Sequence, residues 1–146
     1  MLPRAYANEH CSIAATLEIV GDRWTLLILR EACQGVRRFT DFEDRLGVAR
    51  TVLSDRLARL VDEGIMKRRR YQERPERFEY CLTAKGRDLW PVLSALRTWG
   101  DRHLMGGNPP LLVRHRDCGG LITDRRVCAD CGAPVEVDDV ERDLAS

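Results

Sequence analysis

Residues 50–83 read RTVLSDRLARLVDEGIMKRRRYQERPERFEYCLT, and this stretch decides the fold. Its first half carries apolar residues at helical spacing over Arg50–Glu63 and stops at a glycine, which predicts an amphipathic helix. Its second half favours two antiparallel strands, Ile65–Tyr71 and Phe78–Leu82, around a turn at Gln72–Arg77 that holds a proline. A helix followed by a hairpin dense in arginine is the layout of a winged helix–turn–helix, and it points to duplex DNA as the partner.

Three more helices are expected before this stretch. The first spans about Ser12–Val20, and a second, WTLLILREAC, follows Asp22, which is expected to cap it. The third starts at a capping box in which Thr40 is the cap and Glu43 lies three residues on. Because a tight turn near Gly47 joins this short helix to the next one, the two form a helix–turn–helix unit.

The chain after the hairpin predicts a helix, a linker and a small tail. Thr83 should cap a long helix over about Ala84–Leu104, and Pro91 inside it should kink or divide that helix. Residues 106–110, GGNPP, form a linker. We therefore expect a winged helix–turn–helix DNA-binding and dimerisation domain over residues 1–105 and a zinc-ribbon-like tail over 111–146. The fold class is mainly α (α+β) with a two-stranded wing.

Composition and charge fit a soluble protein with a local basic patch. The 146 residues are 44% hydrophobic, and the longest apolar run, Leu26–Leu29, is too short to span a bilayer. The start of the chain lacks a signal-peptide pattern, so we expect a cytoplasmic protein and no membrane partner. The net charge of +1 is uneven, because residues 67–77 hold six basic side chains against two acidic ones. Such a local patch favours a phosphate backbone.

The outer side of the 50–63 helix supplies the first candidate DNA contacts. Short polar side chains and arginine near its N-terminal end suit close approach to base edges in a major groove. The alternative is a solvated face on which Arg56 or Arg59 pairs with Asp55 or Asp62 of the same helix. The candidates are Arg50, Thr51, Ser54 and Arg56.

The hairpin supplies the second group, for phosphate or minor-groove contacts. Side chains alternate between the faces of a strand, so Lys67 and Arg69 must point away from Arg68 and Arg70. Some of these arginines are expected to pair with the hairpin's glutamates instead of DNA. The candidates are Arg68, Arg70, Arg74 and Arg77, of which the last two lie nearest the tip.

Five motifs in one collinear order resemble the HxlR-type regulators, winged-helix relatives of the MarR group. They cover about Cys11–Leu104 and read GDRWTLLILRE, RRFTDF, VLSDRLARL, PERFEYCLTAKG and ALRTWG. The resemblance implies a homodimer on a pseudo-palindromic operator, with the first and last helices at the dimer interface. It also implies a possible sensor role for Cys11, since the matching cysteine is a redox or electrophile sensor in some members.

The six cysteines divide into two groups. Cys11 lies near a helix N-terminus, where the helix dipole favours a thiolate, but it also suits a small residue buried at a dimer interface. Cys33 and Cys81 are expected in the core. Three tryptophans, Trp24, Trp90 and Trp99, suit packing or an effector pocket.

The remaining three cysteines cluster in the tail as His115-x2-Cys118-x9-Cys128-x2-Cys131. Two ligand pairs of this spacing predict a closed structural zinc site with three sulfurs and one imidazole, with no open position for catalysis. An oxidised Cys128–Cys131 pair or free thiols are the alternatives.

Together these patterns predict a dimeric bacterial DNA-binding transcriptional regulator, a repressor that responds to a redox, electrophile or small-molecule signal. A winged-helix and zinc-ribbon module that binds proteins without sequence-specific DNA binding is the alternative. An enzyme is not expected, because the sequence offers no phosphate-binding glycine loop, nucleophile–base pair or open metal site.

Overall fold

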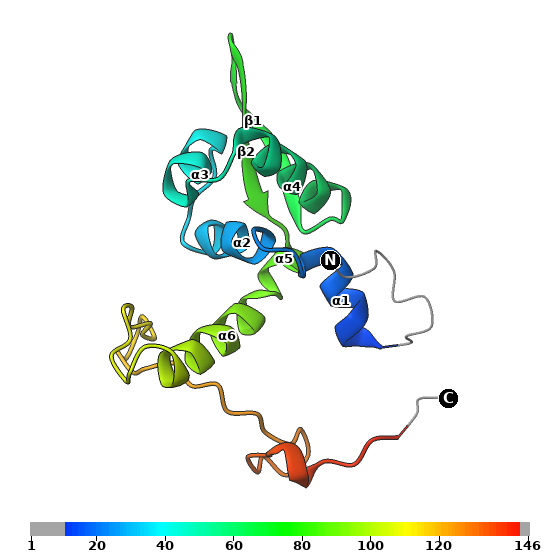
Figure 1. The fold of residues 1–146 in the computed structure, drawn as a ribbon, viewed down its shortest axis with the longest axis vertical. Coiled ribbons are helices and arrows are strands. Elements are labelled where there is room, and N and C mark those ends of the chain that lie inside the picture. The colour runs from blue at the N-terminus through cyan, green and yellow to red at the C-terminus, as the bar shows by residue number, and fades with distance from the viewer. Residues whose placement is uncertain (1–10, 144–146) are drawn as a thin grey trace. The chain divides into compact units, whose positions relative to one another are not determined.

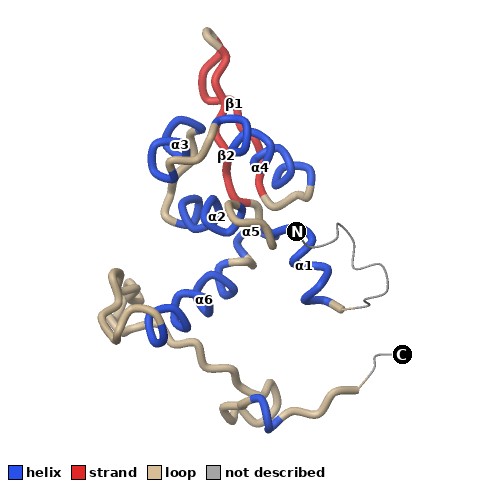
Figure 2. The backbone as a smooth tube through the Cα atoms, viewed as in Figure 1, coloured by secondary structure: helices blue, strands red, loops and turns tan. Residues whose placement is uncertain are grey.

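The computed structural model describes residues 11–143, which fall into two compact units that divide between Leu93 and Ser94. In the first unit, helices gather around the base of a two-stranded hairpin that projects beyond them (Figure 1, Figure 2). The elements in chain order are α1 Ser12–Val20, α2 Thr25–Cys33, α3 Phe39–Leu46, α4 Arg50–Asp62, β1 Met66–Glu73, β2 Glu76–Leu82, α5 Ala84–Arg87, α6 Trp90–His103 and the 3₁₀ turn η1 Val137–Asp139.

The core of the first unit lies where α2, α3, α4 and the start of β1 meet. Leu53, Leu57 and Leu60 form the buried stripe of α4, at the i, i+4, i+7 spacing of one helix face. They pack with Phe42 of α3 and with apolar residues of α2. Burial of each large apolar side chain stabilises the fold by roughly 1.5–3 kcal/mol. This cluster therefore holds the two helices of the helix–turn–helix against α2.

The start of α2 is fixed by a carboxylate, as the sequence predicts. The backbone amides of Trp24 and Thr25 donate to Asp22 Oδ1 over 2.9 and 3.1 Å, and the Thr25 hydroxyl donates to the other oxygen. Arg56 of α4 donates from Nε to the same Oδ1 over 3.0 Å. Asp22 thus connects the N-terminus of α2 to the middle of α4.

These hydrogen bonds change the pKa of Asp22. Partial burial of the carboxyl acts to raise its pKa, but the bonds from Thr25, the Trp24 amide and Arg56 outweigh burial and lower it below the ordinary value. The charged form is therefore the one that the fold stabilises.

The predicted capping box at Thr40 is wrong, because α3 already begins at Phe39. Arg38 is extended and forms an antiparallel bridge with Glu79 of β2, and the Tyr80 amide donates to the Arg37 carbonyl over 2.7 Å. The carbonyl of Arg38 then accepts the amides of the first helical turn. The start of α3 is set by pairing with the hairpin and not by a side-chain cap.

The hairpin is longer than the sequence predicts, and its turn is shorter. Arg74 and Pro75 alone form the turn, whereas a turn over Gln72–Arg77 was expected. The register shifts between Arg70 and Gln72, which leaves Tyr71 as an extra residue in β1. Because this bulge absorbs the extra residue, Gln72 pairs with Arg77 and the ladder continues to the tip.

The long helix expected after the hairpin is divided, as Pro91 predicts. The Thr83 side chain caps α5 by accepting the Gly86 amide over 3.1 Å. A second helix, α6, starts at Trp90, so that Pro91 lies in its first turn, where a missing amide hydrogen costs no helical bond. No helix in residues 11–143 is both long and apolar enough to cross a bilayer.

The tail in the second unit has little regular structure. It contains two short antiparallel bridges, Arg114–Leu121 and Val127–Pro134, and the 3₁₀ turn η1. None of residues 111–143 is buried. Packing of apolar side chains therefore does not hold this segment in shape.

The Asp22 contacts predict a measurable loss of stability in Asp22→Ala. The variant loses a helix cap and a partner of Arg56, so the free energy of unfolding at neutral pH should fall by about 1–2 kcal/mol in urea titrations. Because the folded pKa is lowered, this stabilisation is present above the unfolded pKa of about 3.9 and is lost as pH falls through the folded value. The gap between variant and wild type should close at acidic pH.

Asp44→Ala, which removes an exposed carboxylate of α3, is the matched control and should change stability little. Equal losses for the two variants at neutral pH would contradict the assigned role of Asp22.

Candidate nucleic-acid interface

The outer face of α4 carries a shallow groove lined by short side chains. Thr51, Ser54 and Ala58 lie on this exposed side, opposite the buried leucines, and Arg50 and Phe39 border the same groove. Small hydroxyl and methyl groups let a helix approach base edges closely, and both hydroxyls can donate or accept hydrogen bonds. Three of the four residues predicted on this helix, Arg50, Thr51 and Ser54, therefore share one accessible surface.

Arg50 is exposed at the N-terminal end of α4. Its guanidinium lies 5.1 Å from the Phe39 ring centre, and Nη1 lies 3.4 Å from Glu43 Oε1. Its side chain is 70% exposed, and an exposed ion pair of this length is worth little. The guanidinium is therefore available to a phosphate.

Arg56 differs from the other predicted contacts on α4. Its Nε donates to Asp22 over 3.0 Å, Nη1 pairs with Asp55, and its side chain is only 30% exposed. Pairing with Asp55 was the alternative expected from the sequence. Two carboxylates already bind the guanidinium. We therefore assign Arg56 a structural role between α4 and α2 and do not include it in the proposed DNA-contact surface.

The hairpin separates its arginines by strand alternation, as the sequence predicts. Arg69 is held by Glu79, its cross-strand partner, and Arg68 lies over the Phe78 ring at 3.9 Å on the other face. The hydrogen bond from Arg69 lowers the pKa of the Glu79 carboxyl. This pair therefore stays ionised at neutral pH and contributes no net charge to the surface.

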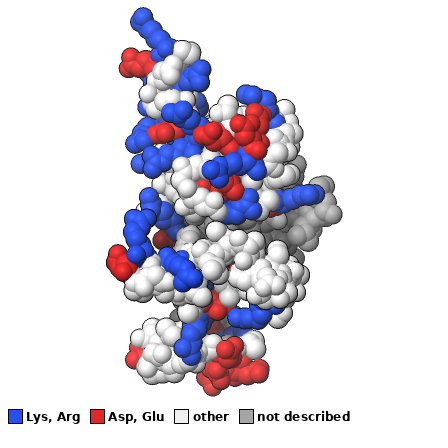
Figure 3. All heavy atoms as spheres, turned by 90° about the vertical axis from the view of Figure 1, so that its left-hand side faces the viewer, with Lys and Arg blue, Asp and Glu red and all other residues white. Residues whose placement is uncertain are grey.

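Positive charge remains available at the hairpin tip. Arg70 Nη2 lies 3.8 Å from Glu76 Oε2, a long and exposed contact. Arg74, in the turn, and Arg77, on β2, are exposed, and neither forms an ion pair within residues 11–143. Figure 3 shows Lys and Arg side chains along the hairpin at the top of the view. The tip can therefore reach a phosphate backbone or a minor groove.

Arg38 adds a positive charge beside the hairpin, and it was not among the DNA contacts predicted from the sequence. Its guanidinium lies 4.6 Å from the ring centre of Tyr71, the bulged residue of β1. The bridge of Arg38 to β2 could not be expected from strand patterning, because one residue makes no periodic signal. The middle of the hairpin is thus wider and more basic than the two strands alone.

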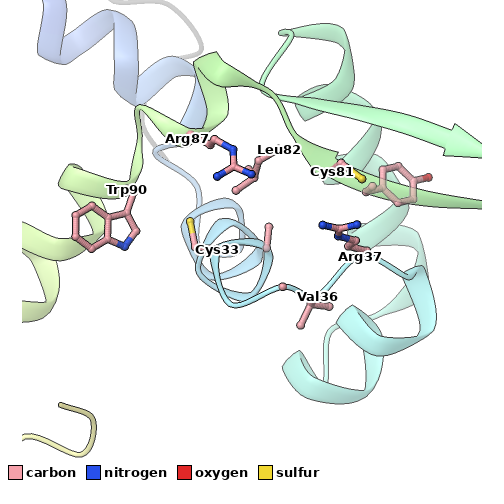
Figure 4. Close-up of a pocket in the computed structure, with 10 residues that line it drawn as sticks. Cys33, Val36, Arg37, Cys81, Leu82, Arg87 and Trp90 are labelled. Atoms are coloured by element: carbon pink, nitrogen blue, oxygen red, sulfur yellow. The ribbon is translucent and has the colours of Figure 1, made fainter. Parts of the chain in front are cut away.

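A separate pocket of about 350 Å³ lies on the first unit (Figure 4). Cys33, Cys81, Arg37, Arg87 and Trp90 are among its lining residues, so Trp90 does border a pocket. Cys33 is exposed and Cys81 half-buried, and the expectation that both lie in the core is wrong. Cys33 is the last residue of α2. The pKa of its thiol is raised, because neighbouring protein atoms displace part of its water, and this effect outweighs the nearby Arg87.

Cys11 is exposed at the N-cap of α1. Its backbone carbonyl accepts the Ala15 amide over 3.0 Å, whereas its side chain makes no capping hydrogen bond. Within the single chain the thiol is therefore accessible rather than buried.

The predicted metal ligands lie in two local pairs. His115 Nδ1 is 3.3 Å from Cys118 Sγ in the first turn of the tail. In the second turn the backbone amides of Cys131 and Asp130 point to Cys128 and lower the pKa of its thiol. Within residues 11–143 no group of three or more His, Cys, Asp or Glu side chains gathers as a metal site. The two pairs thus form, but they are not brought together.

Comparisons with known proteins agree with the winged helix–turn–helix fold. The model of the HxlR-like helix-turn-helix family matches residues 19–108, and the chain belongs to that family. Its relatives are named as transcriptional regulators, so the protein is a helix–turn–helix transcriptional regulator and not an enzyme.

Three relatives illustrate the extent of the likeness. The uncharacterized HTH-type transcriptional regulator Rv3095 of Mycobacterium tuberculosis is 46% identical over 125 residues, which cover 85% of this chain and 79% of that protein. The crystal structure of PA1607, a candidate transcription factor, aligns with a TM-score of 0.85 and 34% identity over 94% of this chain and 97% of its own. The redox regulator HypR in its reduced form aligns with a TM-score of 0.60 and 27% identity over 67% and 100%.

The hairpin geometry predicts that Arg74→Ala weakens DNA binding by a similar factor on every sequence. Loss of one phosphate contact should also lower the slope of log K against log salt concentration by about 1. Fluorescence anisotropy with specific and random duplexes over a salt series measures both quantities.

The double change Arg69→Gln/Glu79→Gln is the control, because it removes an ion pair without changing net charge. It should leave the salt slope unaltered. An unaltered slope in Arg74→Ala as well would exclude the hairpin tip from the backbone contact.

Proposed function

We propose that the protein is a homodimeric repressor that binds a pseudo-palindromic operator, with α4 of each subunit in a major groove and the hairpin on the adjacent backbone. The observation that carries this proposal is the groove on α4, lined by Thr51, Ser54 and Ala58, beside a hairpin tip whose arginines are exposed. The short side chains suit base edges, whereas the arginines suit phosphates.

Dimerisation is supported by apolar faces that the single chain leaves exposed. On α1, Ile13 and Leu17 are 72% and 45% exposed at i, i+4 spacing. On α6, Val92, Leu96 and Trp99 are 38%, 52% and 56% exposed at i, i+4, i+7 spacing. Large apolar side chains in such stripes favour contact with another protein surface, and a second copy of the chain is the partner that would pair two DNA-binding helices.

Repression is the sign of regulation that we propose for this mode of docking. Two helices in successive major grooves and two hairpins beside them would cover DNA that overlaps a promoter, and occupancy alone would then block transcription. A reporter gene under a promoter that contains the bound site measures whether the protein represses or activates. Deletion of the regulator should raise expression of the reporter.

A combined experiment tests the proposed function. Selection from a random duplex library should recover an inverted repeat whose half-sites lie about one helical turn apart, and sedimentation should show two chains on each duplex. Ser54→Ala should relax the preference at one or two positions of each half-site, at about 1–3 kcal/mol per position for a lost base contact. Ala58→Ser, on the same face, is a matched change that should shift the preference without removing binding.

Recovery of no consensus, with binding that is equal for all duplexes, would favour a protein-interaction module instead. Recovery of a single half-site bound by one chain would contradict the dimer while leaving DNA binding intact.

For the controlling signal we infer oxidation or electrophilic modification of Cys11. Its thiol is exposed at the start of α1, a helix that carries one of the two apolar faces, so modification there would alter the proposed dimer contact. The similarity to a redox regulator supports this inference. Cys33 is a poorer sensor, because its raised pKa leaves less thiolate at neutral pH.

Mild peroxide should therefore release the operator from the wild-type protein and from Cys33→Ser, but not from Cys11→Ser. Release that persists in Cys11→Ser, measured by anisotropy alongside mass spectrometry of the thiols, would remove Cys11 as the sensor. Release that is lost in Cys33→Ser would instead assign the signal to the pocket thiol.

A further inference from the structure

The tail contains two turns with the same backbone hydrogen bonds, thirteen residues apart (115 and 128, 118 and 131). In the first turn the His115 amide donates to the Gly120 carbonyl over 2.8 Å, and in the second the Cys128 amide donates to Ala133 over 2.9 Å. A second bond matches as well, from Gly119 to the His115 carbonyl and from Gly132 to that of Cys128, over 2.8 and 2.9 Å. The sequence repeats Asp-Cys-Gly at residues 117–119 and 130–132, and the backbone hydrogen bonds repeat with it.

Each turn places a glycine directly after its second candidate ligand. Gly119 and Gly132 have φ angles of +73° and +72°, in the left-handed region that other residues rarely adopt. The flanking bridges also correspond, Arg114–Leu121 in one turn and Val127–Pro134 in the other. The chain therefore builds one local structure twice and puts its His and Cys side chains at equivalent positions.

The side chains within each turn are arranged for a shared metal ion. His115 Nδ1 lies 3.3 Å from Cys118 Sγ, close to the roughly 3.5 Å between nitrogen and sulfur ligands of one tetrahedral zinc ion. The other ring nitrogen, Nε2, lies 3.9 Å from an Asp117 carboxylate oxygen, which is too long for a hydrogen bond.

A backbone amide also faces sulfur in the first turn. The Gly120 amide donates to Cys118 Sγ over 3.4 Å. Such donors stabilise thiolate charge around a metal.

Burial of apolar side chains does not account for the defined structure of the two turns. None of residues 111–143 is buried, and Leu111, Leu121 and Val127 are more than half exposed. A segment of this size without a core needs a cross-link or a metal to hold a defined structure.

We propose that His115, Cys118, Cys128 and Cys131 of one chain bind a single Zn²⁺ ion, which brings the two turns together as a closed zinc ribbon. Each turn supplies two ligands, and three thiolates with one imidazole complete a tetrahedral structural site. In residues 11–143 the two pairs are separate groups, so metal binding and closure of the ribbon are one event. The proposal is independent of the DNA-binding surface, which lies on α4 and the hairpin.

Metal content of the full chain, purified without chelator, is the first test. We expect about one zinc per chain, and less than about half in Cys118→Ser and in Cys131→Ser. Cys33→Ser, in the first unit, is the control and should keep about one. His115→Cys should also keep the metal, because a fourth thiolate can replace the imidazole.

Cobalt substitution tests the geometry directly. The wild-type protein should show the visible bands of tetrahedral Co²⁺ with sulfur-to-metal charge transfer, and His115→Cys should shift these bands while keeping them. Limited proteolysis should cut residues 111–136 faster after metal removal, while the winged domain still binds DNA.

Three results would overturn the proposal. The first is a Cys128–Cys131 disulfide in the purified chain that, after reduction, takes up neither zinc nor cobalt. The second is a metal content that survives Cys118→Ser or is lost in Cys33→Ser. The third is one zinc per two chains, which would place the site between subunits.

Discussion

The rest of the first unit depends on the burial of one side of α4. Leu53, Leu57 and Leu60 are all at most 1% exposed, and they can be buried together only if the helix keeps one rotation about its axis. That rotation leaves Thr51 and Ser54 on the outside. The contact between Arg56 and Asp22 holds the same rotation from the polar side, because it joins α4 to the N-terminus of α2. Core packing and an ion pair thus orient the surface that we assign to DNA.

The hairpin shows how charge is divided between folding and binding. Arg69 is neutralised by Glu79, and Arg56 by two carboxylates, so a count of arginines overstates the charge that a phosphate can meet. The exposed guanidiniums at Arg74 and Arg77 remain. Some arginines therefore stabilise the fold around the proposed DNA-binding surface through ion pairs, whereas those at the hairpin tip remain available for contact with DNA.

Elements governed by local periodicity could be predicted well. The limits of α1 and the start of α4 agree with the sequence prediction, and the break just before Pro91 is consistent with a proline that is tolerated only in the first turn of a helix. Elements set by contacts distant in the sequence, or by an irregularity that interrupts strand alternation, could not be predicted. The start of α3 depends on the bridge of Arg38 to Glu79, and the hairpin turn depends on the bulge at Tyr71.

The candidate site follows the same division. The exposure of Thr51 and Ser54 follows from helical spacing and could be predicted. The pairing of Arg56 with Asp22 could not, because the two residues lie 34 positions apart in the sequence. Cys33 is the last residue of α2 and borders a pocket, so it is exposed although cysteine is a residue type usually found in the core. In the tail the ligand spacing and the repeated Cys-Gly could be read from the sequence, whereas the matching backbone hydrogen bonds and bridges could not.

Guanine methylation interference on the selected operator tests the central claim most directly, because N7 methylation blocks the major groove alone. Docking of α4 in the major groove predicts strong interference at guanines of two half-sites about one helical turn apart. In complexes of the Ser54→Ala variant, interference at one position of each half-site should weaken. Binding that tolerates methylation at every guanine of the operator, while minor-groove modification abolishes it, would contradict docking of α4 in the major groove.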